Sequence, residues 1–505
     1  MPDNISCAPG VSLRQLLPEA TIFGADDIVV KACTADSRTC EAGDLFAALV
    51  GCHVDGHDYV GPAIRRGAVA VLTERYVPVA GSPICVVPDS RAALGVICQA
   101  LAGRPSERLK VIGVTGTNGK TSTCWLIASV LEAGGFRAGF TGTIVNSDGG
   151  SLDSSAMTTP PAPMLANWLA RMDANGCSHA VLEMSSHALA QSRAAGIQFA
   201  GACVTNVRRD HLDFHNSVEN YRQVKSRLLR QVIPGGFAVF NADDAVSGGF
   251  ATTFDGPALT IGIENSAEVT ASIVERHLSE QMFLLQAGSE TVPVRTRIIG
   301  DGHVYNCLMA AAVGLLHGIS LTDIASGLER VEKIPGRMER VECGQSFGVL
   351  VDYAHTPDAL NCVLRSLRAM TAGRLICVFG AGGQRDREKR PLMAEAVEAH
   401  ADLAVVTDDN PRREDPTKIR RDIMRGFLRS DAVIVKSDRA DAIQWALGQA
   451  EPGDCVLIAG KGHEDYQIVG SQRHWLDDRE IARQWLYQHA MLPHEAAAVV
   501  RRRAA

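Results

Sequence analysis

The stretch that decides the fold runs Leu109-Lys-Val-Ile-Gly-Val-Thr115 and continues Gly116-Thr-Asn-Gly-Lys-Thr121. Its first half is a short apolar run that predicts a buried strand, and a helical pattern follows from about Thr121 to Ala133. A glycine-rich turn between strand and helix aims backbone N–H groups at a phosphate, and Lys120 adds a positive charge. The Thr121 hydroxyl is a typical ligand of Mg²⁺. The stretch therefore predicts a nucleotide site formed by Gly116, Thr117, Asn118, Gly119, Lys120, Thr121 and Ser122.

The spacing of this loop departs from the most common phosphate-loop pattern. That pattern has a glycine five residues before Gly119, where this chain has Val114. The alternative interpretation is an ordinary tight turn between a strand and a helix. The strand and helix on either side of the Gly-Lys-Thr core favour phosphate binding, and the chain has no N-K-x-D guanine motif. We therefore expect ATP rather than GTP.

Outward from this stretch, short apolar runs alternate with helical patterns, which predicts parallel sheets covered on both faces. The expected fold class is α/β with three domains: a central P-loop-type ATPase sheet follows an N-terminal domain and precedes a C-terminal, doubly wound Rossmann-like sheet. The domains are expected at 1–108, 109–337 and 338–505. Strands are expected at 68–72, 109–115, 179–183, 200–205, 236–240, 349–352, 375–379, 403–407, 433–435 and 456–459, and helices at 121–133, 162–172, 357–370 and 439–449.

Composition excludes several classes of protein. The chain has 505 residues, enough for about three domains, and its net charge of -7 argues against a general nucleic-acid binder. No stretch of 18 apolar residues predicts a membrane span, and the first ten residues do not resemble a secretory signal. The 14 cysteines form no C-x-x-C pair, so we expect reduced thiols in a cytoplasmic protein.

Polar side chains follow two further predicted strands, where α/β proteins place their sites. Glu183 ends one strand and is a natural partner for an ion at Thr121, since Mg²⁺ favours oxygen ligands. After the other strand come Asp210, His211, Asp213 and His215. These four have the ligand types of a metal site, but they fit a capped helix start with exposed charges equally well. Lys225 follows on a helical pattern, where a lysine is usually a solvated surface charge.

Taken together, these residues resemble the Mur ligase family, the ATP-dependent amino-acid ligases of peptidoglycan precursor synthesis. The resemblance covers nearly the whole chain and rests on ordered motifs. They are Asp36-Ser-Arg38, Gly43-Asp-Leu-Phe46, Thr115–Thr121, Glu183-Met-Ser-Ser-His187, Thr205-Asn206, Asp210-His-Leu-Asp213, Asn306, Gly336-Arg-Met-Glu339 and Asp352-Tyr-Ala-His-Thr-Pro357.

The resemblance implies addition of meso-diaminopimelate to the D-glutamate of UDP-N-acetylmuramoyl-L-alanyl-D-glutamate through an acyl phosphate. ATP and Mg²⁺ would be required, the partners would be these small molecules, and a monomer is the default. Asp409-Asn-Pro-Arg412 looks like the signature of diaminopimelate-adding members, and an arginine fork matches a carboxylate. An ordinary turn is the alternative at Asn410-Pro411. The remaining rivals are a lysine-adding ligase, a folylpolyglutamate-type ligase and a non-catalytic nucleotide-binding scaffold.

The resemblance also implies roles for particular residues. The catalytic group is Lys120, Lys225, His211 and Glu183; Lys225 matches a carbamylated position (N6-carboxylysine), and Mg²⁺ would meet Thr121, Glu183, His211 and this carbamate. ATP would also contact Asn306, Arg337 and Asp352. The UDP precursor would contact Ala35, Ser37, Cys52, His53, Val54, Thr158, Thr159, Ser185, Gln191 and Arg193. Diaminopimelate would contact Arg385, Asp409, Asn410, Pro411, Arg412, Gly460 and Glu464.

One motif departs from the family pattern. A Gly-x-Phe-Asn-x-x-Asn stretch near the adenine is usual, and here it reads Gly300-Asp-Gly-His-Val-Tyr-Asn306. Asn306 is kept, whereas Gly302 and His303 replace the phenylalanine and the first asparagine. Only Asn306 is therefore carried over to the predicted ATP site.

Overall fold

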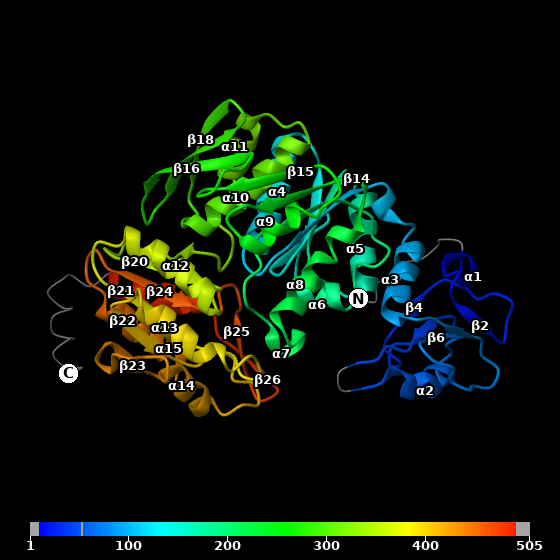
Figure 1. The fold of residues 1–505 in the computed structure, drawn as a ribbon. Coiled ribbons are helices and arrows are strands. Elements are labelled where there is room, and N and C mark those ends of the chain that lie inside the picture. Colours follow the sequence, from blue (N-terminus) through cyan, green and yellow to red (C-terminus); the bar gives the residue numbers. More distant parts are fainter. Residues whose placement is uncertain (1–9, 52–53, 491–505) are drawn as a thin grey trace.

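The computed structural model describes residues 10–51 and 54–490, so Cys52 and His53 of the predicted precursor site lie outside the described residues. The strands form three main sheets, each with helices packed against it (Figure 1). Within the described ranges, no helix is both long and apolar enough to span a bilayer.

The first sheet is small, with the strand order β2-β7-β6-β5-β4, and only the β2–β7 pair is antiparallel. Helix α3 packs Leu94 and Ile97 into its core, and Asp89 caps that helix by accepting hydrogen bonds from two backbone N–H groups. The strands are β1 (Val11–Ser12), β2 (Thr21–Phe23), β3 (Val29–Val30), β4 (Cys33–Thr34), β5 (Leu45–Ala47), β6 (Ala70–Thr73) and β7 (Ile84–Val86). The helices are α1 (Leu13–Leu16), η1 (Gly56–Tyr59), α2 (Val60–Arg65), α3 (Ser90–Leu101) and η2 (Pro105–Glu107).

The second sheet has eleven strands in the order β11-β10-β9-β12-β8-β13-β14-β15-β16-β17-β18. The strands from β9 to β16 are parallel, and an antiparallel hairpin extends each end. The strands are β8 (Lys110–Thr115), β9 (Ala138–Thr141), β10 (Val145–Ser147), β11 (Leu152–Ser154), β12 (His179–Glu183), β13 (Phe199–Val204), β14 (Val232–Asn241), β15 (Ala258–Gly262), β16 (Val269–Arg276), β17 (Gln281–Ala287) and β18 (Glu290–Thr296).

Helices cover both faces of the second sheet. Along β8, Ile112 and Val114 pack with α4 and α10, while Val111 packs with α5 on the opposite face. After β8 the chain forms β9 and β12 on one side of that strand, and it then returns to form β13 on the opposite side of β8. The carboxyl ends of β12, β8 and β13 therefore lie at a topological switch point. The helices are α4 (Lys120–Ala133), α5 (Ala162–Ala174), α6 (Ser186–Ala190), α7 (Leu212–His215), α8 (Val218–Ser226), η3 (Leu229–Gln231), α9 (Ala245–Ala251), α10 (Asp301–Leu316) and α11 (Leu321–Glu329).

The third sheet has the order β19-β20-β24-β21-β22-β23 and is parallel except for the β19–β20 pair. Helices α12, α13 and α14 cover one face, and α15 and α16 cover the other. The strands are β19 (Glu339–Arg340), β20 (Gly348–Asp352), β21 (Leu375–Phe379), β22 (Leu403–Val406), β23 (Val433–Val435), β24 (Cys455–Ala459), β25 (Tyr466–Val469) and β26 (Gln472–Trp475). The helices are α12 (Pro357–Met370), α13 (Lys389–Glu398), α14 (Pro416–Met424), η4 (Ser430–Ala432), α15 (Arg439–Gln449) and α16 (Asp478–Ala490).

The structure confirms the predicted α/β class and every predicted strand and helix to within a few residues. Strands β16, β17 and β18 and the hairpin β25–β26 were not predicted, nor were the shorter parallel strands β5, β7, β9 and β15. In β16 and β18 polar residues interrupt the apolar ones, so these two strands lack the continuous apolar runs that identify buried parallel strands. The domain limits after residues 108 and 337 stay a prediction.

Candidate active site

The loop between β8 and α4 requires two of its glycines. Gly116 has a φ of +152°, and a Cβ there would lie 1.9 Å from the hydroxyl oxygen of Thr205. Gly119 has a φ of +84°, and its Cβ would lie 2.3 Å from Oδ1 of Asn306. A side chain at either position would therefore meet both backbone strain and a steric clash.

The strand on one side of the loop holds it in place. The N–H of Asn118 donates to Oδ1 of Asn206 at 2.9 Å, and Thr205 Oγ1 donates to the Asn118 carbonyl at 2.7 Å. Lys120 folds back over the loop, so that its Nζ donates to the carbonyls of Gly116 and Thr117 at 3.1 and 2.8 Å. Burial lowers the pKa of Lys120 from its ordinary value, and the nearby carboxylates oppose that shift. The ammonium thus lies where the loop would receive phosphate.

Glu183, at the end of β12, is the centre of a buried network beside this loop. Its Oε1 accepts hydrogen bonds from the hydroxyls of Thr121 at 3.0 Å and Thr143 at 2.9 Å. Its Oε2 accepts the backbone N–H of Thr143 at 2.8 Å, and the residue is 1% exposed. The predicted neighbourhood of Thr121 and Glu183 is therefore what the structure shows. Thr143 was not predicted, since it follows β9 in no recognisable motif.

The oxygen donors of this network suit a magnesium ion. Mg²⁺ takes few protein ligands and fills its octahedron with water and substrate phosphates. Thr121 and Glu183 offer a hydroxyl and a carboxylate beside the phosphate loop, which fits that requirement. Within residues 10–51 and 54–490, no three side chains of His, Cys, Asp or Glu are arranged to hold a metal ion. Asp210, His211, Asp213 and His215 therefore do not form such a group by themselves, and a metal-binding role for His211 stays a prediction.

Lys225 is not the surface charge that its helical pattern predicts. It is 1% exposed on α8, and its Nζ donates to the carbonyl of Gly116 at 2.6 Å. The ammonium also lies 4.6 Å from the ring centroid of Tyr221. Burial, reinforced by the positive charge of Lys120, holds the pKa of Lys225 well below its ordinary value. The amine therefore points at the underside of the phosphate loop.

His211 lies next to this loop in a group of packed aromatic rings. Its Nε2 is 3.3 Å from Oδ2 of Asp210, and its ring centroid is 4.9 Å from that of His187. Burial lowers the pKa of His211 to about 3, although Asp210 opposes the shift. The ring is therefore neutral at neutral pH, which is the form that binds metal ions.

The three remaining predicted ATP residues lie around the same loop. Asn306 Oδ1 accepts a hydrogen bond from Thr123 Oγ1 at 3.2 Å on α4. Arg337 donates to Thr121 Oγ1 at 3.2 Å and stacks on Tyr353, 4.4 Å from its ring centroid. Asp352 accepts two backbone N–H bonds at 2.7 Å, and burial raises its pKa despite these bonds and the nearby Arg337.

Five of the predicted precursor residues form one connected group, which contains Thr158, Thr159, Ser185, Gln191 and Arg193. The Thr159 hydroxyl donates to the Glu183 carbonyl at 2.6 Å, and Arg193 donates to the Thr159 carbonyl at 2.6 Å. Arg193 also donates twice to the amide oxygen of Gln191.

The other predicted precursor residues belong to the first sheet and its loops. Ser37 is buried and Val54 is 52% exposed. Hydrogen bonds between described residues do not directly link Ala35, Ser37 or Val54 to the group around Thr159. Arg91, which donates to the Val50 carbonyl at 2.7 Å, lies near enough to Arg193 to lower its pKa, although burial of Arg193 is the larger cause.

A second polar cluster lies at the carboxyl ends of β22 and β24. The Asn410 amide donates to Glu464 at 2.8 Å, and its Oδ1 accepts from the buried Lys461 at 3.3 Å. Burial alone would raise the pKa of Asp409, but Lys461 and then Arg439 outweigh it, so that pKa is lowered. Lys461 is 0% exposed and bonds Glu464 at 3.1 Å, yet sequence analysis gave it no role. It lies between Gly460 and Glu464, two residues of the predicted diaminopimelate site, and that position was the available signal.

Arg412 extends from this cluster in a strained conformation, with a φ of +55°. Its Nη1 donates to the Gly383 carbonyl at 2.9 Å. Burial, followed by the positive charge of the exposed Arg385, lowers the pKa of Arg412. Gly460 leaves room for Asp409, because a Cβ there would lie 2.9 Å from Oδ2 of that carboxylate. The predicted residues of this motif are therefore gathered, with two cations close together.

Direct contacts join the second and third sheets near the two clusters. Arg209 pairs with Glu388 at 2.6 Å, and the Asn118 amide donates to Asp358 at 3.0 Å. Farther along, Arg340 donates to the Ser279 carbonyl at 2.6 Å. The phosphate loop is thus held against the part of the chain that carries the second cluster.

The fold and this geometry define an α/β protein with a phosphate loop at a switch point and a second polar cluster across an interface. Comparisons with known proteins agree. Residues 114–314 match the Mur ligase middle domain, residues 336–462 match the Mur ligase glutamate ligase domain, and residues 29–101 match the Mur ligase family catalytic domain. The chain belongs to the Mur ligase family.

Three similar proteins carry the same name. UDP-N-acetylmuramoyl-L-alanyl-D-glutamate–2,6-diaminopimelate ligase of Geobacillus thermodenitrificans is 43% identical over 91% of this chain and 95% of its own. The protein of that name from Xanthomonas campestris is 41% identical over 97% of this chain and 99% of its own. A solved structure with this name is 32% identical, with a TM-score of 0.68, and covers 96% of this chain and 100% of its own.

Proposed function

We propose that this chain is an ATP-dependent, ADP-forming ligase that joins diaminopimelate to the D-glutamate of UDP-N-acetylmuramoyl-L-alanyl-D-glutamate. The observation that carries the proposal is the pairing of a phosphate loop with the Asp409–Arg412 cluster across a bonded interface. Names of relatives above 40% identity over nearly the whole chain support the same substrates. The protein works in the cytoplasm as a monomer, with domains at 1–108, 109–337 and 338–505.

The reaction begins with activation of a carboxylate, which is a poor acyl donor. The γ-carboxylate of the D-glutamate attacks the γ-phosphorus of ATP, so the bond to the bridging oxygen breaks and ADP leaves. The chain contributes mainly position and charge, as in other phosphoryl transfers. Lys120 and Arg337 lie at the loop and neutralise the phosphates. Thr121 and Glu183 hold Mg²⁺, which supplies further neutralisation of phosphate oxygens when bound.

The second half of the reaction forms the amide bond. A neutral amine of diaminopimelate attacks the acyl phosphate carbonyl, and inorganic phosphate leaves. The Arg412 and Arg385 guanidiniums match the far carboxylate, since a planar fork binds both carboxylate oxygens. The carboxylates of Asp409 and Glu464 balance the ammonium at the distal end of diaminopimelate, although Lys461 already neutralises part of their negative charge.

Lys225 carries a carbamate in the active enzyme. The supporting observations are its burial and its contact with Gly116 at 2.6 Å. A neutral amine adds to CO₂ by forming an N–C bond and releasing one proton to water. The product is an anion beside the phosphate loop and His211. Incubation with ¹³C-bicarbonate should give a carbamate signal by NMR that Lys225→Gln abolishes; a signal retained in that variant would reject this assignment.

The ligase proposal is tested by phosphate release from ATP in the presence of the UDP-dipeptide and either meso-diaminopimelate or L-lysine. Turnover with diaminopimelate, and little with lysine, is expected. Lys120→Ala should abolish release with either amine. Preferred use of lysine would support the ligase activity but reject the assignment of Arg412 to the distal carboxylate of diaminopimelate. No release with either amine, despite bound ATP, would reject ligation of this precursor.

A further inference from the structure

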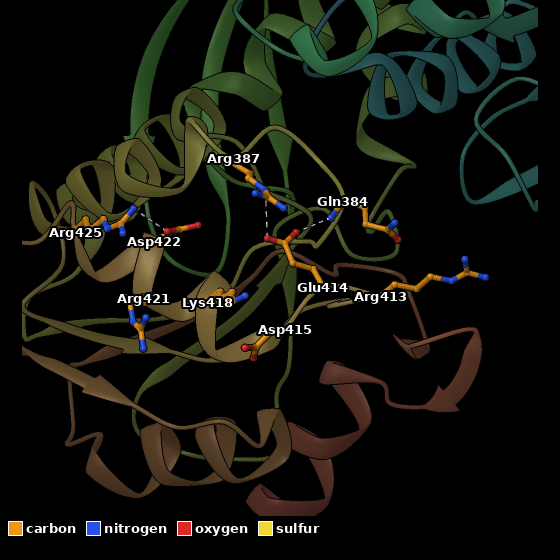
Figure 2. Close-up of a pocket in the computed structure, with 9 residues that line it drawn as sticks. All are labelled: Gln384, Arg387, Arg413, Glu414, Asp415, Lys418, Arg421, Asp422 and Arg425. Atoms are coloured by element: carbon orange, nitrogen blue, oxygen red, sulfur yellow. Dashed lines mark hydrogen bonds and ion pairs between the residues drawn. The ribbon is translucent and has the colours of Figure 1, made fainter. Parts of the chain in front are cut away.

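A charged pocket of about 530 Å³ lies in the part of the chain that follows β21, between the loop before α13 and the helix α14 (Figure 2). Nothing in the proposed reaction uses it. It is lined by Gln384, Arg387, Arg413, Glu414, Asp415, Lys418, Arg421, Asp422 and Arg425. Its volume is in the range of small-molecule sites, but such sites are mostly apolar and this lining is not. The pocket therefore suits a charged ligand.

Two of the three carboxylates are already bound at the floor of the pocket. The fully buried Arg390 donates to both oxygens of Glu414 at 2.8 Å and to Asp422 at 3.0 Å. The backbone N–H of Gln384 adds a bond to Glu414 at 2.9 Å. Arg425 pairs with Asp422 at 3.0 Å. This rigid, internally neutralised floor leaves little negative charge for the cations of the rim.

The cations of the rim outnumber the charges left to balance them. Five Arg and Lys side chains line the pocket against three carboxylates. Two of the five are paired, Arg425 with Asp422 and Arg387 with Glu414 at 3.4 Å, and the third carboxylate, Asp415, caps α14. Among the described residues, the side chains of Arg413, Lys418 and Arg421 have no hydrogen-bond or ion-pair partner. Lys418 and Arg421 lie three residues apart on one face of α14, where like charges repel. An anion bound between them would relieve that repulsion.

We propose that this pocket binds a small molecule through a phosphate group. Arginine and lysine side chains from a loop and a helix line the same pocket, and such side chains recognise the oxygens of a phosphate. The whole chain carries a net charge of -7, so the basic surface is local and does not fit a nucleic acid. Two sources supply the same chemistry: inorganic phosphate or pyrophosphate, and the phosphate chain of a nucleotide.

The pocket is connected to the cluster that we assign to the incoming amino acid. The backbone N–H of Glu414 donates to the Pro411 carbonyl at 3.1 Å, and that of Gly383 donates to the Asn410 carbonyl at 2.9 Å. Residues 410–414 thus have the pocket on one side and the Asp409–Arg412 cluster on the other. An anion in the pocket should change the KM for the amino acid more than it changes the kcat of the ligase reaction. This effect on the kinetics rests on the proposed function, whereas binding of the anion to the pocket does not.

Calorimetric titration of the full chain tests the site. ADP is added first. If the protein binds a second equivalent of ADP, and the Lys418→Glu/Arg421→Glu variant does not, the ligand of the pocket is a nucleotide. If one equivalent binds, pyrophosphate and then phosphate are titrated into the ADP-loaded protein, so that the phosphate loop is blocked. We expect binding that weakens at least tenfold in this variant and with rising salt.

The matched control is Lys31→Glu/Arg230→Glu, which changes the net charge equally at two exposed positions outside the pocket. It should bind like the unaltered protein. Retention of the first ADP equivalent shows that each variant is folded, and the milder Lys418→Gln/Arg421→Gln variant should show a smaller loss. No second ADP and no anion binding to the ADP-loaded protein would overturn the proposal, as would equal binding by the variant and its control.

Discussion

Replacing Gly119 by alanine should weaken ATP binding through one identifiable contact. Gly119 has a φ of +84°, and its new Cβ would lie 2.3 Å from Oδ1 of Asn306. Gly176 offers a matched control, since its φ is +74° and an added Cβ there meets no atom within 4 Å. Both variants incur the left-handed backbone strain, which costs about 1 kcal/mol. Only Gly119→Ala also meets a neighbour.

The size of the difference follows from the hydrogen bond of Asn306. To accept the new methyl group, its side chain must rotate and lose the bond from Thr123 Oγ1, which is 3.2 Å long. One such bond is worth about 1 kcal/mol. Gly119→Ala should therefore lose about 2 kcal/mol of unfolding free energy, and Gly176→Ala about 1 kcal/mol. The KM for ATP should rise about fivefold in the first variant only, because about 1.4 kcal/mol corresponds to a tenfold change.

Denaturant unfolding and initial rates at varied ATP measure both quantities. The double variant Gly119→Ala/Asn306→Ala removes the clash, so Gly119→Ala should cost only the strain when Asn306 is already alanine. A coupling energy of about 1 kcal/mol in this cycle is expected. Equal stability and equal ATP KM in Gly119→Ala and Gly176→Ala, or additive effects in the cycle, would refute the reasoning.

Three further predictions concern stability, pH and the precursor. Asp478→Ala should cost about 3–5 kcal/mol, because it strips the buried Arg439 of bonds at 2.7 and 2.8 Å. Replacement of the half-buried Glu480 on the same helix by alanine should stay within about 1 kcal/mol, and calorimetric unfolding that showed equal losses would contradict this. Burial lowers the pKa of His303 to about 3, so the free energy of unfolding should fall by up to about 1.4 kcal/mol per pH unit as the pH falls below about 6.5. His303→Asn should flatten that slope, and parallel plots of unfolding free energy against pH for the two proteins from pH 7 to 5 would disprove it. Thr159→Val removes the hydroxyl that bonds the Glu183 carbonyl and the Ser185 N–H, so it should raise the KM for the UDP-dipeptide with little change in the KM for ATP. Equal shifts in both KM values would argue against the assignment of Thr159 to the precursor site.

The sequence predicts the central strands of the two larger sheets because these parallel strands are continuous apolar runs with glycine or polar residues at their ends. The helix at 357–370 was predicted at its observed limits because proline marks its start and apolar residues recur along one face. Strand β16 shows the opposite case, since Thr270 and Ser272 alternate with apolar residues next to the antiparallel end of the sheet. Its pairing partners lie on both sides in the sheet, so no local pattern sets it apart from a loop.

The site divides in the same way. Glu183 could be predicted because it ends a buried strand next to the one that carries the phosphate loop, and neighbouring parallel strands end at one edge. Thr143 could not, because its two bonds to Glu183 depend on how a hairpin at the far side of β9 folds back. The pairing of Asn118 with Asp358 spans 240 residues of sequence, so it depends on how two sheets dock.

Lys225 shows how a weak sequence signal gains meaning from the structure. On α8 the buried residues are Tyr221, Val224 and Lys225, so the lysine occupies an apolar stripe at the spacing of a core position. A buried ammonium is costly unless it is paired, and such a group usually loses its charge instead. The hydrogen bond from Lys225 goes to the neutral carbonyl of Gly116, which offers no opposite charge. A lysine kept here, directly beneath the phosphate loop, is therefore better explained as an amine that reacts than as a cation that stabilises the fold.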